Sequence, residues 1–172
     1  MQLEVIDHAI YYEKFEIISR KLMSAQFPWY WSENVNEIND RNTVGLDDFQ
    51  FTHLFYAEEV KDEKSLYYDI LTPLIELLNP KHLIRIKANL ITKNNQIIEH
   101  GFHTDNGLKY LDALTAIYYV NNNNGYTVFK NGVKVNSVAN RLLVFPAIQE
   151  HSGTTCTDSK NRVIINFNFI PN

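Results

Sequence analysis

The second half of the chain alternates apolar and polar residues with a period of two, the pattern of β-strands that bury one face. Leu83–Thr92 is the longest example, with Arg85, Lys87 and Asn89 at polar positions. Similar runs predict further strands at 97–103, 114–120, 126–130, 141–145 and 162–170. Asn-Gly dipeptides, which favour tight turns, lie between some of them, at 124–125 and 131–132. Many short strands at this spacing predict a sandwich or a barrel.

The first half of the chain predicts mainly helices. Apolar residues at helical spacing indicate a helix over 12–25. A second helix is expected over 64–78, with a break or kink at Pro73 and an end at Asn79-Pro80. Between the two, FTHLFY at 51–56 has the composition of a strand.

The length of the chain, 172 residues, fits one domain, and no linker or internal repeat divides it. Residues 1–80 are expected to supply helical support and the first strands, and residues 81–172 the β core. The predicted fold class is mainly β with supporting α, with the N-terminal helices packed on one sheet.

Charge and composition argue against several classes of protein. The net charge is −4 and no basic stripe is visible, so we expect no nucleic-acid partner. The single cysteine, Cys156, allows neither an intrachain disulfide nor a cysteine zinc site, which fits a cytoplasmic protein. No signal peptide and no apolar run of about 20 residues is present, so a soluble chain without a membrane partner is expected.

His103 and Asp105 form a His-x-Asp motif at the end of a predicted strand. On an extended backbone, residues i and i+2 point to the same face, so the imidazole and the carboxylate can converge on one metal ion. His151, beyond three further predicted strands, is the candidate third ligand. Two histidines and one carboxylate are the facial triad of non-haem iron(II), which leaves coordination positions open. The alternative is a surface turn, because Asp105-Asn106-Gly107 also has turn composition.

Arg162 begins the last predicted strand, and the two faces of this strand differ. One face is apolar, with Val163, Ile165, Phe167 and Phe169. The other is too polar for a dry core, with Arg162, Ile164, Asn166 and Asn168. An inward arginine needs a carboxylate, which its planar fork binds in bidentate fashion. A ligand carboxylate is the attractive partner, and a salt bridge to Glu99 or Asp112 is the alternative.

Together, these segments resemble a known family. Positions 83–170 are similar to the 2-oxoglutarate- and iron(II)-dependent dioxygenases, particularly the prolyl hydroxylase branch that includes the hypoxia-factor prolyl hydroxylases. The matching segments, in the order of the family, are RIKA (85–88), HTDN (103–106), TAIYYVN (115–121), GYTVF (125–129), NRLLVF (140–145), His151 and Arg162. The resemblance implies a double-stranded β-helix, or jelly roll, with residues 81–172 as its catalytic core.

The resemblance also implies roles for single residues. His103, Asp105 and His151 become the ligands of Fe(II), and Arg162 the partner of the distal carboxylate of 2-oxoglutarate. Tyr119 matches a tyrosine whose hydroxyl assists at that carboxylate, although it also fits a core aromatic. The implied cofactor is Fe(II), with 2-oxoglutarate and O2 as cosubstrates.

Two positions depart from the pattern of the family. Lys93 stands where those hydroxylases place another tyrosine that contacts the cosubstrate; it either reaches the cosubstrate carboxylate or projects into solvent. Asn166 stands where a threonine is common. Both are kept as candidates for cosubstrate binding. No motif matches the residues that recognise the prime substrate in that branch.

The implied activity is hydroxylation of an unactivated C–H bond with release of succinate and CO2. Candidate prime substrates are a prolyl residue in a peptide or protein, another amino acid, or a small metabolite, and the sequence does not specify the oligomeric state. One alternative is a cupin-like metalloenzyme without 2-oxoglutarate, which has no need of Arg162. The other is a non-catalytic jelly-roll binding module in which the histidines and the aspartate are coincidental.

Two further segments are candidates for the surroundings of the site. The aromatic residues Phe27, Trp29, Tyr30 and Trp31 either line an entrance or pack in the core. The small, polar loop 152–161 is a candidate lid, with Cys156 exposed within it.

Overall fold

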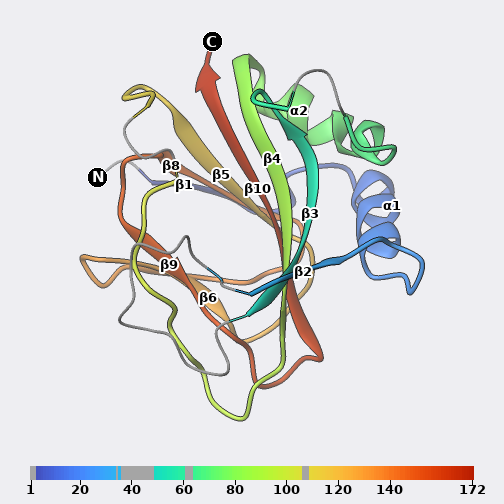
Figure 1. The fold of residues 1–172 in the computed structure, drawn as a ribbon, viewed down its shortest axis with the longest axis vertical. Helices are drawn as coiled ribbons and strands as arrows, with labels where there is room; N and C mark the ends of the chain where they lie inside the picture. The colour runs from blue at the N-terminus through green and yellow to red at the C-terminus, as the bar shows by residue number, and fades with distance from the viewer. Residues whose placement is uncertain (1–2, 34, 36–48, 61–63, 106–108) are drawn as a thin grey trace.

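A computed structural model describes residues 3–33, 35, 49–60, 64–105 and 109–172 of the chain (Figure 1). Its main feature is a sheet of seven strands in the order β1-β8-β5-β10-β4-β3-β2. All neighbouring strands of this sheet pair antiparallel. In chain order the strands are β1 (Glu4–Ile6), β2 (Tyr30–Ser32), β3 (Gln50–Ala57), β4 (Pro80–Thr92), β5 (Leu114–Tyr119), β8 (Arg141–Pro146) and β10 (Asn161–Pro171).

A second sheet has three strands in the order β7-β6-β9. They are β6 (Tyr126–Phe129), β7 (Lys134–Asn136) and β9 (His151–Gly153). The turn from β6 to β7 contains Gly132, whose φ of 87° lies in the region that favours glycine, as the Asn-Gly signal predicts. The strands predicted at 51–56, 83–92, 114–120, 126–130, 141–145 and 162–170 are all confirmed in position.

The strand predicted at 97–103 is wrong. This segment runs beside residues 151–155 but makes only two isolated bridges, Glu99 to Thr154 and His103 to His151. Some backbone hydrogen bonds to residues 151–155 remain, but side-chain hydroxyls replace the regular backbone partner at two positions. The Ile98 amide donates to Thr155 Oγ1, and Ser152 Oγ donates to the carbonyl of His100. Such side-chain bonds compete with a strand ladder.

Two helical segments cover one face of the main sheet. They are α1 (Tyr12–Leu22) and the pair formed by the 3-10 turn η2 (Tyr68–Leu71) and α2 (Thr72–Leu78). The helix predicted over 64–78 is shorter because Pro73 occupies the first turn of α2, where its missing N–H costs nothing. Asn79, with a φ of 42°, ends α2 as predicted, and β4 follows at once. None of the described helices is long and apolar enough to span a membrane.

The alternation of β10 separates the core from a polar cavity. Its residues 163, 165, 167 and 169 pack with Ile18, Leu22, Leu71 and Leu74 of the helices in the main core. Arg162, Ile164 and Asn166 face the other way and line a cavity, which residues of the second sheet also line. The predicted class, mainly β with N-terminal helices on one sheet, is therefore confirmed, and so is the assignment of the two faces of this strand.

Candidate metal centre

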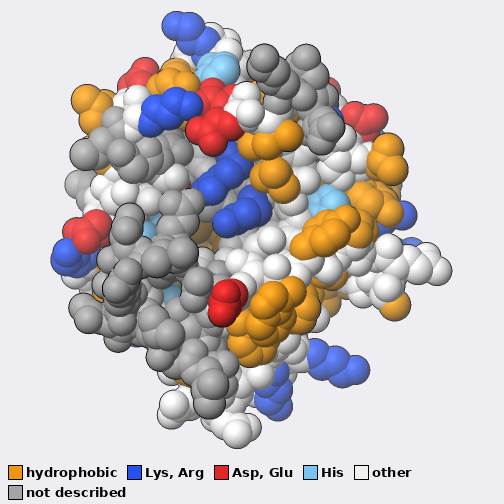
Figure 2. Space-filling view, in the orientation of Figure 1, with side chains coloured by type: hydrophobic (Ala, Val, Ile, Leu, Met, Phe, Trp, Pro, Cys, Tyr) orange, Lys and Arg blue, Asp and Glu red, His pale blue; other side chains and the backbone are white. Residues whose placement is uncertain are grey.

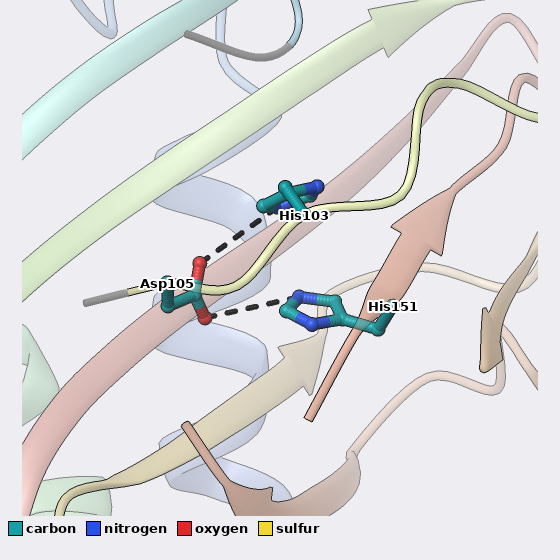
Figure 3. A group of neighbouring side chains, drawn as sticks. All are labelled: His103, Asp105 and His151. Atoms are coloured by element: carbon teal, nitrogen blue, oxygen red, sulfur yellow. Dashed lines mark ion pairs between the residues drawn. The ribbon is translucent and has the colours of Figure 1, made fainter. Parts of the chain in front are cut away.

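Three side chains from separate parts of the chain converge at one point in the cavity. Asp105 lies between two imidazoles, with its Oδ1 3.8 Å from His103 Nε2 and its Oδ2 3.8 Å from His151 Nε2 (Figure 3). One ligand atom from each of the three lies within 4.8 Å of the others. His151 comes from β9, whereas His103 and Asp105 come from the irregular segment that crosses beside it. The spacing suits three ligands on one face of a metal ion.

Backbone carbonyls orient both imidazoles toward the metal position. His103 Nδ1 lies 3.3 Å from the carbonyl oxygen of Gly101, and His151 Nδ1 lies 3.0 Å from that of Gln149. A carbonyl accepts only, so each Nδ1 carries the proton and each Nε2 keeps its lone pair free. A hydrogen bond of this kind fixes the tautomer and the ring orientation of a metal-binding histidine. Burial and the neighbouring His151 lower the pKa of His103, which favours the neutral, ligating form.

Asp105 is held as an ionised carboxylate by its neighbours. Its Oδ2 accepts hydrogen bonds from Thr115 Oγ1 at 2.7 Å, Asn166 Nδ2 at 3.1 Å and Asn168 Nδ2 at 3.2 Å. Burial raises the pKa of Asp105, but the two imidazoles, the Arg85 guanidinium and the hydrogen bond from Thr115 outweigh burial and hold this pKa well below its ordinary value. Asp105 is therefore buried and hydrogen-bonded, and the alternative of a surface turn is excluded for this residue.

Arg162 lines the same cavity as the three candidate ligands. It is 1% exposed, its Nε donates to Ser137 Oγ at 2.9 Å, and its Nη2 donates to Thr127 Oγ1 at 3.3 Å. Its Nη1 has no hydrogen-bond partner among the described residues. Burial lowers the pKa of Arg162, so the guanidinium lies in surroundings that penalise its charge. A buried cation with an unused donor is suited to an anionic ligand.

No described carboxylate forms an ion pair with Arg162, in contrast to the salt bridge considered from the sequence. Glu99 instead accepts hydrogen bonds from Lys134 and Tyr126. The close approach of Gly125 makes room for the arginine, since a Cβ at that position would lie 2.7 Å from Arg162 Cδ. The physical role of Gly125, the glycine of the GYTVF segment, is therefore to leave space for the Arg162 side chain.

The other three residues predicted to bind the cosubstrate, Asn166, Tyr119 and Lys93, lie in different environments. Asn166 lines the cavity, but its amide holds Asp105. Tyr119 is buried behind Arg162, with the guanidinium carbon 5.8 Å from its ring centroid, and its hydroxyl donates to Thr127 Oγ1. β4 ends at Thr92, so Lys93 lies beyond the strand, where it lines a separate pocket with Asn94 and other residues. The structure therefore does not bring Lys93 to the arginine.

Several cavity residues were not found by sequence reasoning. They are Gln50, Arg85, Lys87, Asn89 and Thr127. The period-two pattern of β4 predicts that Arg85, Lys87 and Asn89 share one face of the strand, but it does not indicate that this face lines a cavity. A lysine such as Lys87 is also typical of a solvent-exposed face. Thr127 accepts hydrogen bonds from Tyr119 and Arg162, which leaves its own hydroxyl hydrogen available to a ligand in the cavity.

The other two candidate segments are packed rather than open. Cys156 is buried, as are Thr154 and Thr155, so the loop 152–161 is not a freely exposed lid. Phe27 belongs to the main core, whereas Tyr30 and Trp31 are exposed on the edge strand β2. None of these aromatic residues is among the described residues that line the cavity.

The donor set fits iron(II). Two neutral imidazole nitrogens and one ionised carboxylate oxygen converge, and three ligands of this kind leave positions for further groups. The orphaned Nη1 of Arg162 in the same cavity fits a carboxylate. The chain thus offers a site for a metal and a site for an organic anion within one cavity.

Comparisons with known proteins bear on the fold. No protein-family model matches the chain, and no curated protein sequence matches it. Solved structures do. A 2OG-Fe(II) oxygenase family oxidoreductase from Burkholderia pseudomallei has a TM-score of 0.66 at 9% identity, over 99% of this chain and 86% of that one. A prolyl hydroxylase from Trichoplax adhaerens, in complex with a fragment of hypoxia inducible factor, has a TM-score of 0.63 at 14% identity, over 98% and 83%.

The epimerase SnoN, solved with Fe3+, alpha ketoglutarate and nogalamycin RO, has a TM-score of 0.64 at 11% identity, over 98% of this chain and 78% of that one. This chain shares one architecture with all three proteins, and here it surrounds a His-Asp-His group. The chain therefore has the jelly-roll fold of the 2-oxoglutarate- and iron(II)-dependent oxygenases.

Proposed function

We propose that the chain is a dioxygenase that uses Fe(II), 2-oxoglutarate and O2 to hydroxylate an unactivated C–H bond, with release of succinate and CO2. One observation carries the proposal: His103, Asp105 and His151 share a cavity with a buried arginine that has no carboxylate partner among the described residues. Metal ligands and an anion site together are what an iron(II) enzyme with a keto-acid cosubstrate requires.

The residues of the chain bind and orient the metal, the cosubstrate and the substrate. Fe(II) and 2-oxoglutarate, when they are bound, supply the activation of O2 and the oxidation. His103, Asp105 and His151 would hold the metal, and three ligands of this kind leave coordination positions for cosubstrate and O2. Arg162 neutralises the distal carboxylate of 2-oxoglutarate, and Thr127 adds a hydroxyl donor beside it. Tyr119 acts through Thr127 and is a positioning residue.

Apolar packing supports the orientation of the buried histidine. Phe145 packs edge-on against His151 with ring centroids 4.7 Å apart, and Phe129 lies 6.3 Å away. Ile117 and Ile164 also line the cavity. These side chains keep the imidazole in one orientation and limit the water that can enter, which strengthens charge interactions inside the cavity.

The hydroxylated C–H bond belongs to one of several kinds of substrate. A prolyl residue in a peptide or protein is one candidate, since the structural neighbours include prolyl hydroxylases. SnoN, by contrast, is an epimerase, so proteins with this fold catalyse more than one type of reaction. The buried Arg162 disfavours the cupin-like alternative, which has no need of it, and the His-Asp-His group together with Arg162 disfavours a non-catalytic binding module.

Anaerobic titration with Fe(II) and then 2-oxoglutarate, followed by visible absorption, tests the proposal. We expect a charge-transfer band in the wild-type protein and its loss in His103→Ala. His8→Asn is the matched control, because His8 is an exposed imidazole away from the cavity. In air, succinate formation is expected in the wild-type protein and in His8→Asn, and it is expected to be lost in His103→Ala. A folded wild-type protein that gives neither band nor succinate contradicts the oxygenase function and favours the binding module.

A further inference from the structure

Arg85 lines the metal cavity close to the metal position. Its Nη2 lies 3.7 Å from Asp105 Oδ1, and its side chain is 26% exposed, so a ligand that enters the cavity can reach it. Its Nε donates to Asn168 Oδ1 at 3.0 Å, which orients the guanidinium, whereas Nη1 and Nη2 form no hydrogen bond with the described residues. Figure 2 shows Lys and Arg side chains near the centre of one face of the molecule. Arg85 therefore presents a fork of donors beside the metal position.

Arg85 is too far along the sheet to bind the same carboxylate as Arg162. In the pairing of β10 with β4, Arg162 lies opposite Ile91, whereas Arg85 lies opposite Asn168. The separation from Ile91 to Arg85 corresponds to about 20 Å along the strand. Asp105 accepts a hydrogen bond from Asn168, so the metal position lies near the Arg85 end. A cosubstrate whose distal carboxylate is bound by Arg162 therefore leaves the Arg85 fork to a different molecule.

The charges of the loaded site leave Arg85 without a counterion. With both imidazoles neutral, the charges of Fe(II) and Arg162 balance those of Asp105 and the two carboxylates of 2-oxoglutarate. Asp105 is the single carboxylate among the described residues that line the cavity, and its charge is then taken up by the metal. Lys87, two residues further along β4, has an interaction of its own and is not counted as a ligand group. The positive charge of Arg85 remains for the anionic group of another molecule.

Asn166 supplies an unused acceptor at the same end of the cavity. It is 8% exposed, its Nδ2 donates to Asp105, and its Oδ1 has no donor among the described residues. Because Asn168 lies opposite Arg85, Asn166 is the diagonal neighbour of Arg85 across the two strands, at about 7–8 Å between Cα atoms. Both side chains approach Asp105, so one small group can contact both. A buried acceptor without a partner is costly, and a ligand with an O–H or N–H group beside its anion removes this cost.

We propose that the prime substrate is an organic acid whose carboxylate binds to the Nη1 and Nη2 donors of Arg85, while an O–H or N–H group of the same molecule donates to Asn166 Oδ1. The proposal rests on the oxygenase function above and names the substrate class for that site. A carboxylate fits the planar fork of an arginine in bidentate fashion. Because Arg85 lies beside Asp105, the hydroxylated C–H bond is expected close to this carboxylate. A free acid and the C-terminus of a peptide share this chemistry, and the test separates the two sources.

The first test measures succinate formation by the iron(II)-loaded protein with 2-oxoglutarate and a panel of matched acids and amides. The panel contains simple aliphatic acids, hydroxy acids, amino acids and tripeptides, each with a free carboxylate and as its carboxamide. We expect the substrate with the lowest KM to be an acid, and its amide to have a KM at least about tenfold higher. A free acid as the best substrate identifies a small molecule as the source of the carboxylate, and a tripeptide identifies a peptide C-terminus.

Variants of Arg85 separate recognition of the acid from a structural effect. In Arg85→Gln the KM for the acid rises about tenfold while that for the amide stays unchanged, because only the acid loses a charged partner. Arg85→Lys retains part of the preference, since lysine keeps the charge but not the planar fork. A merely structural role beside Asp105 would raise both KM values in parallel, together with the Kd of the metal. Arg20→Gln, which removes an exposed charge on α1, is the matched control.

A second measurement does not depend on activity. In the zinc(II)-loaded protein with 2-oxoglutarate, propionate is expected to shift the NMR signal of the Arg85 Nε–H, which is assigned by its absence in Arg85→Gln, and propionamide is not. A shift without the charge-transfer band of the iron(II) protein supports the carboxylate site and contradicts the oxygenase function. A band without the shift contradicts the carboxylate site alone.

Two results of the first test also overturn the proposal. One is a best substrate without a carboxylate, and the other is an acid-to-amide ratio that Arg85→Gln leaves unchanged. Simple aliphatic acids that match the best hydroxy or amino acid overturn the role of Asn166.

Discussion

Replacing Arg162 by methionine removes the buried charge and keeps most of the side-chain volume. In the wild-type protein the guanidinium is 1% exposed and has an unused Nη1 donor, so a bound 2-oxoglutarate carboxylate is desolvated together with it. Loss of one partner from such a pair costs about 2–5 kcal/mol, which corresponds to about a 30- to 4000-fold rise in the Kd of 2-oxoglutarate. The affinity for Fe(II) is expected to change little, because Arg162 contacts none of the three ligands.

The same substitution has a second, opposite effect on stability. Without ligand, the wild-type protein holds a cation in surroundings that lower its pKa, and among the described residues its hydrogen-bond partners are Ser137 and Thr127. Because an isolated buried charge is destabilising, we expect Arg162→Met to unfold at the same or a higher urea concentration than the wild type. Addition of 2-oxoglutarate should then stabilise the wild type alone.

Anaerobic calorimetric titration of Fe(II)-loaded protein with 2-oxoglutarate, paired with urea unfolding, checks both effects. Arg20→Met, on the outer surface of α1, is the matched control and should bind 2-oxoglutarate as the wild type does. Wild-type affinity in Arg162→Met refutes the anion site. Weakened Fe(II) binding together with a lower unfolding midpoint shows instead that Arg162 is structural.

Two further predictions concern the neighbours of the site, and a third concerns Glu58, which does not line the cavity. Gly125→Ala places a Cβ 2.7 Å from Arg162 Cδ, and we expect a loss of about 1–3 kcal/mol of unfolding free energy together with weaker 2-oxoglutarate binding by calorimetry. Asn168→Ala removes a hydrogen bond to Asp105, and the Kd of Fe(II) should rise about 10- to 100-fold in a competition assay with a chelator. Burial raises the pKa of Glu58, but hydrogen bonds from three neighbouring side chains outweigh it and lower this pKa to about 2. Its stabilising effect is therefore present above the ordinary value of 4.5 and lost as the pH falls toward 2, and acid unfolding of Glu58→Gln should lack this part of the pH dependence.

The alternation of the strands made much of the fold predictable. In β10 a strict period of two separates core from cavity residues, because one face must pack on helices and the other must stay polar around a ligand. The same alternation puts the neighbouring residues Tyr118 and Tyr119 of β5 into two different core clusters. Both assignments follow from local patterns, which a single sequence displays.

Features that depend on distant partners were not predictable. The 97–103 segment has the pattern of a strand, but hydroxyls of Ser152 and Thr155 replace the backbone partner at two positions and leave the ladder irregular. Lys93 continues the parity of β4, yet the strand ends one residue earlier and its backbone amide bonds to Lys160 instead. Thr127 comes from the second sheet, and nothing in its sequence neighbourhood marks it as a partner of Arg162.

The most direct test of the account is an anaerobic crystal structure of the protein with Fe(II) and 2-oxoglutarate, with iron located by anomalous scattering. We predict one iron ion bound by His103 Nε2, His151 Nε2 and Asp105, and a carboxylate of 2-oxoglutarate against the Nη1 and Nη2 atoms of Arg162. Iron bound elsewhere, or 2-oxoglutarate placed away from Arg162, contradicts the claim that these four residues form one oxygenase site.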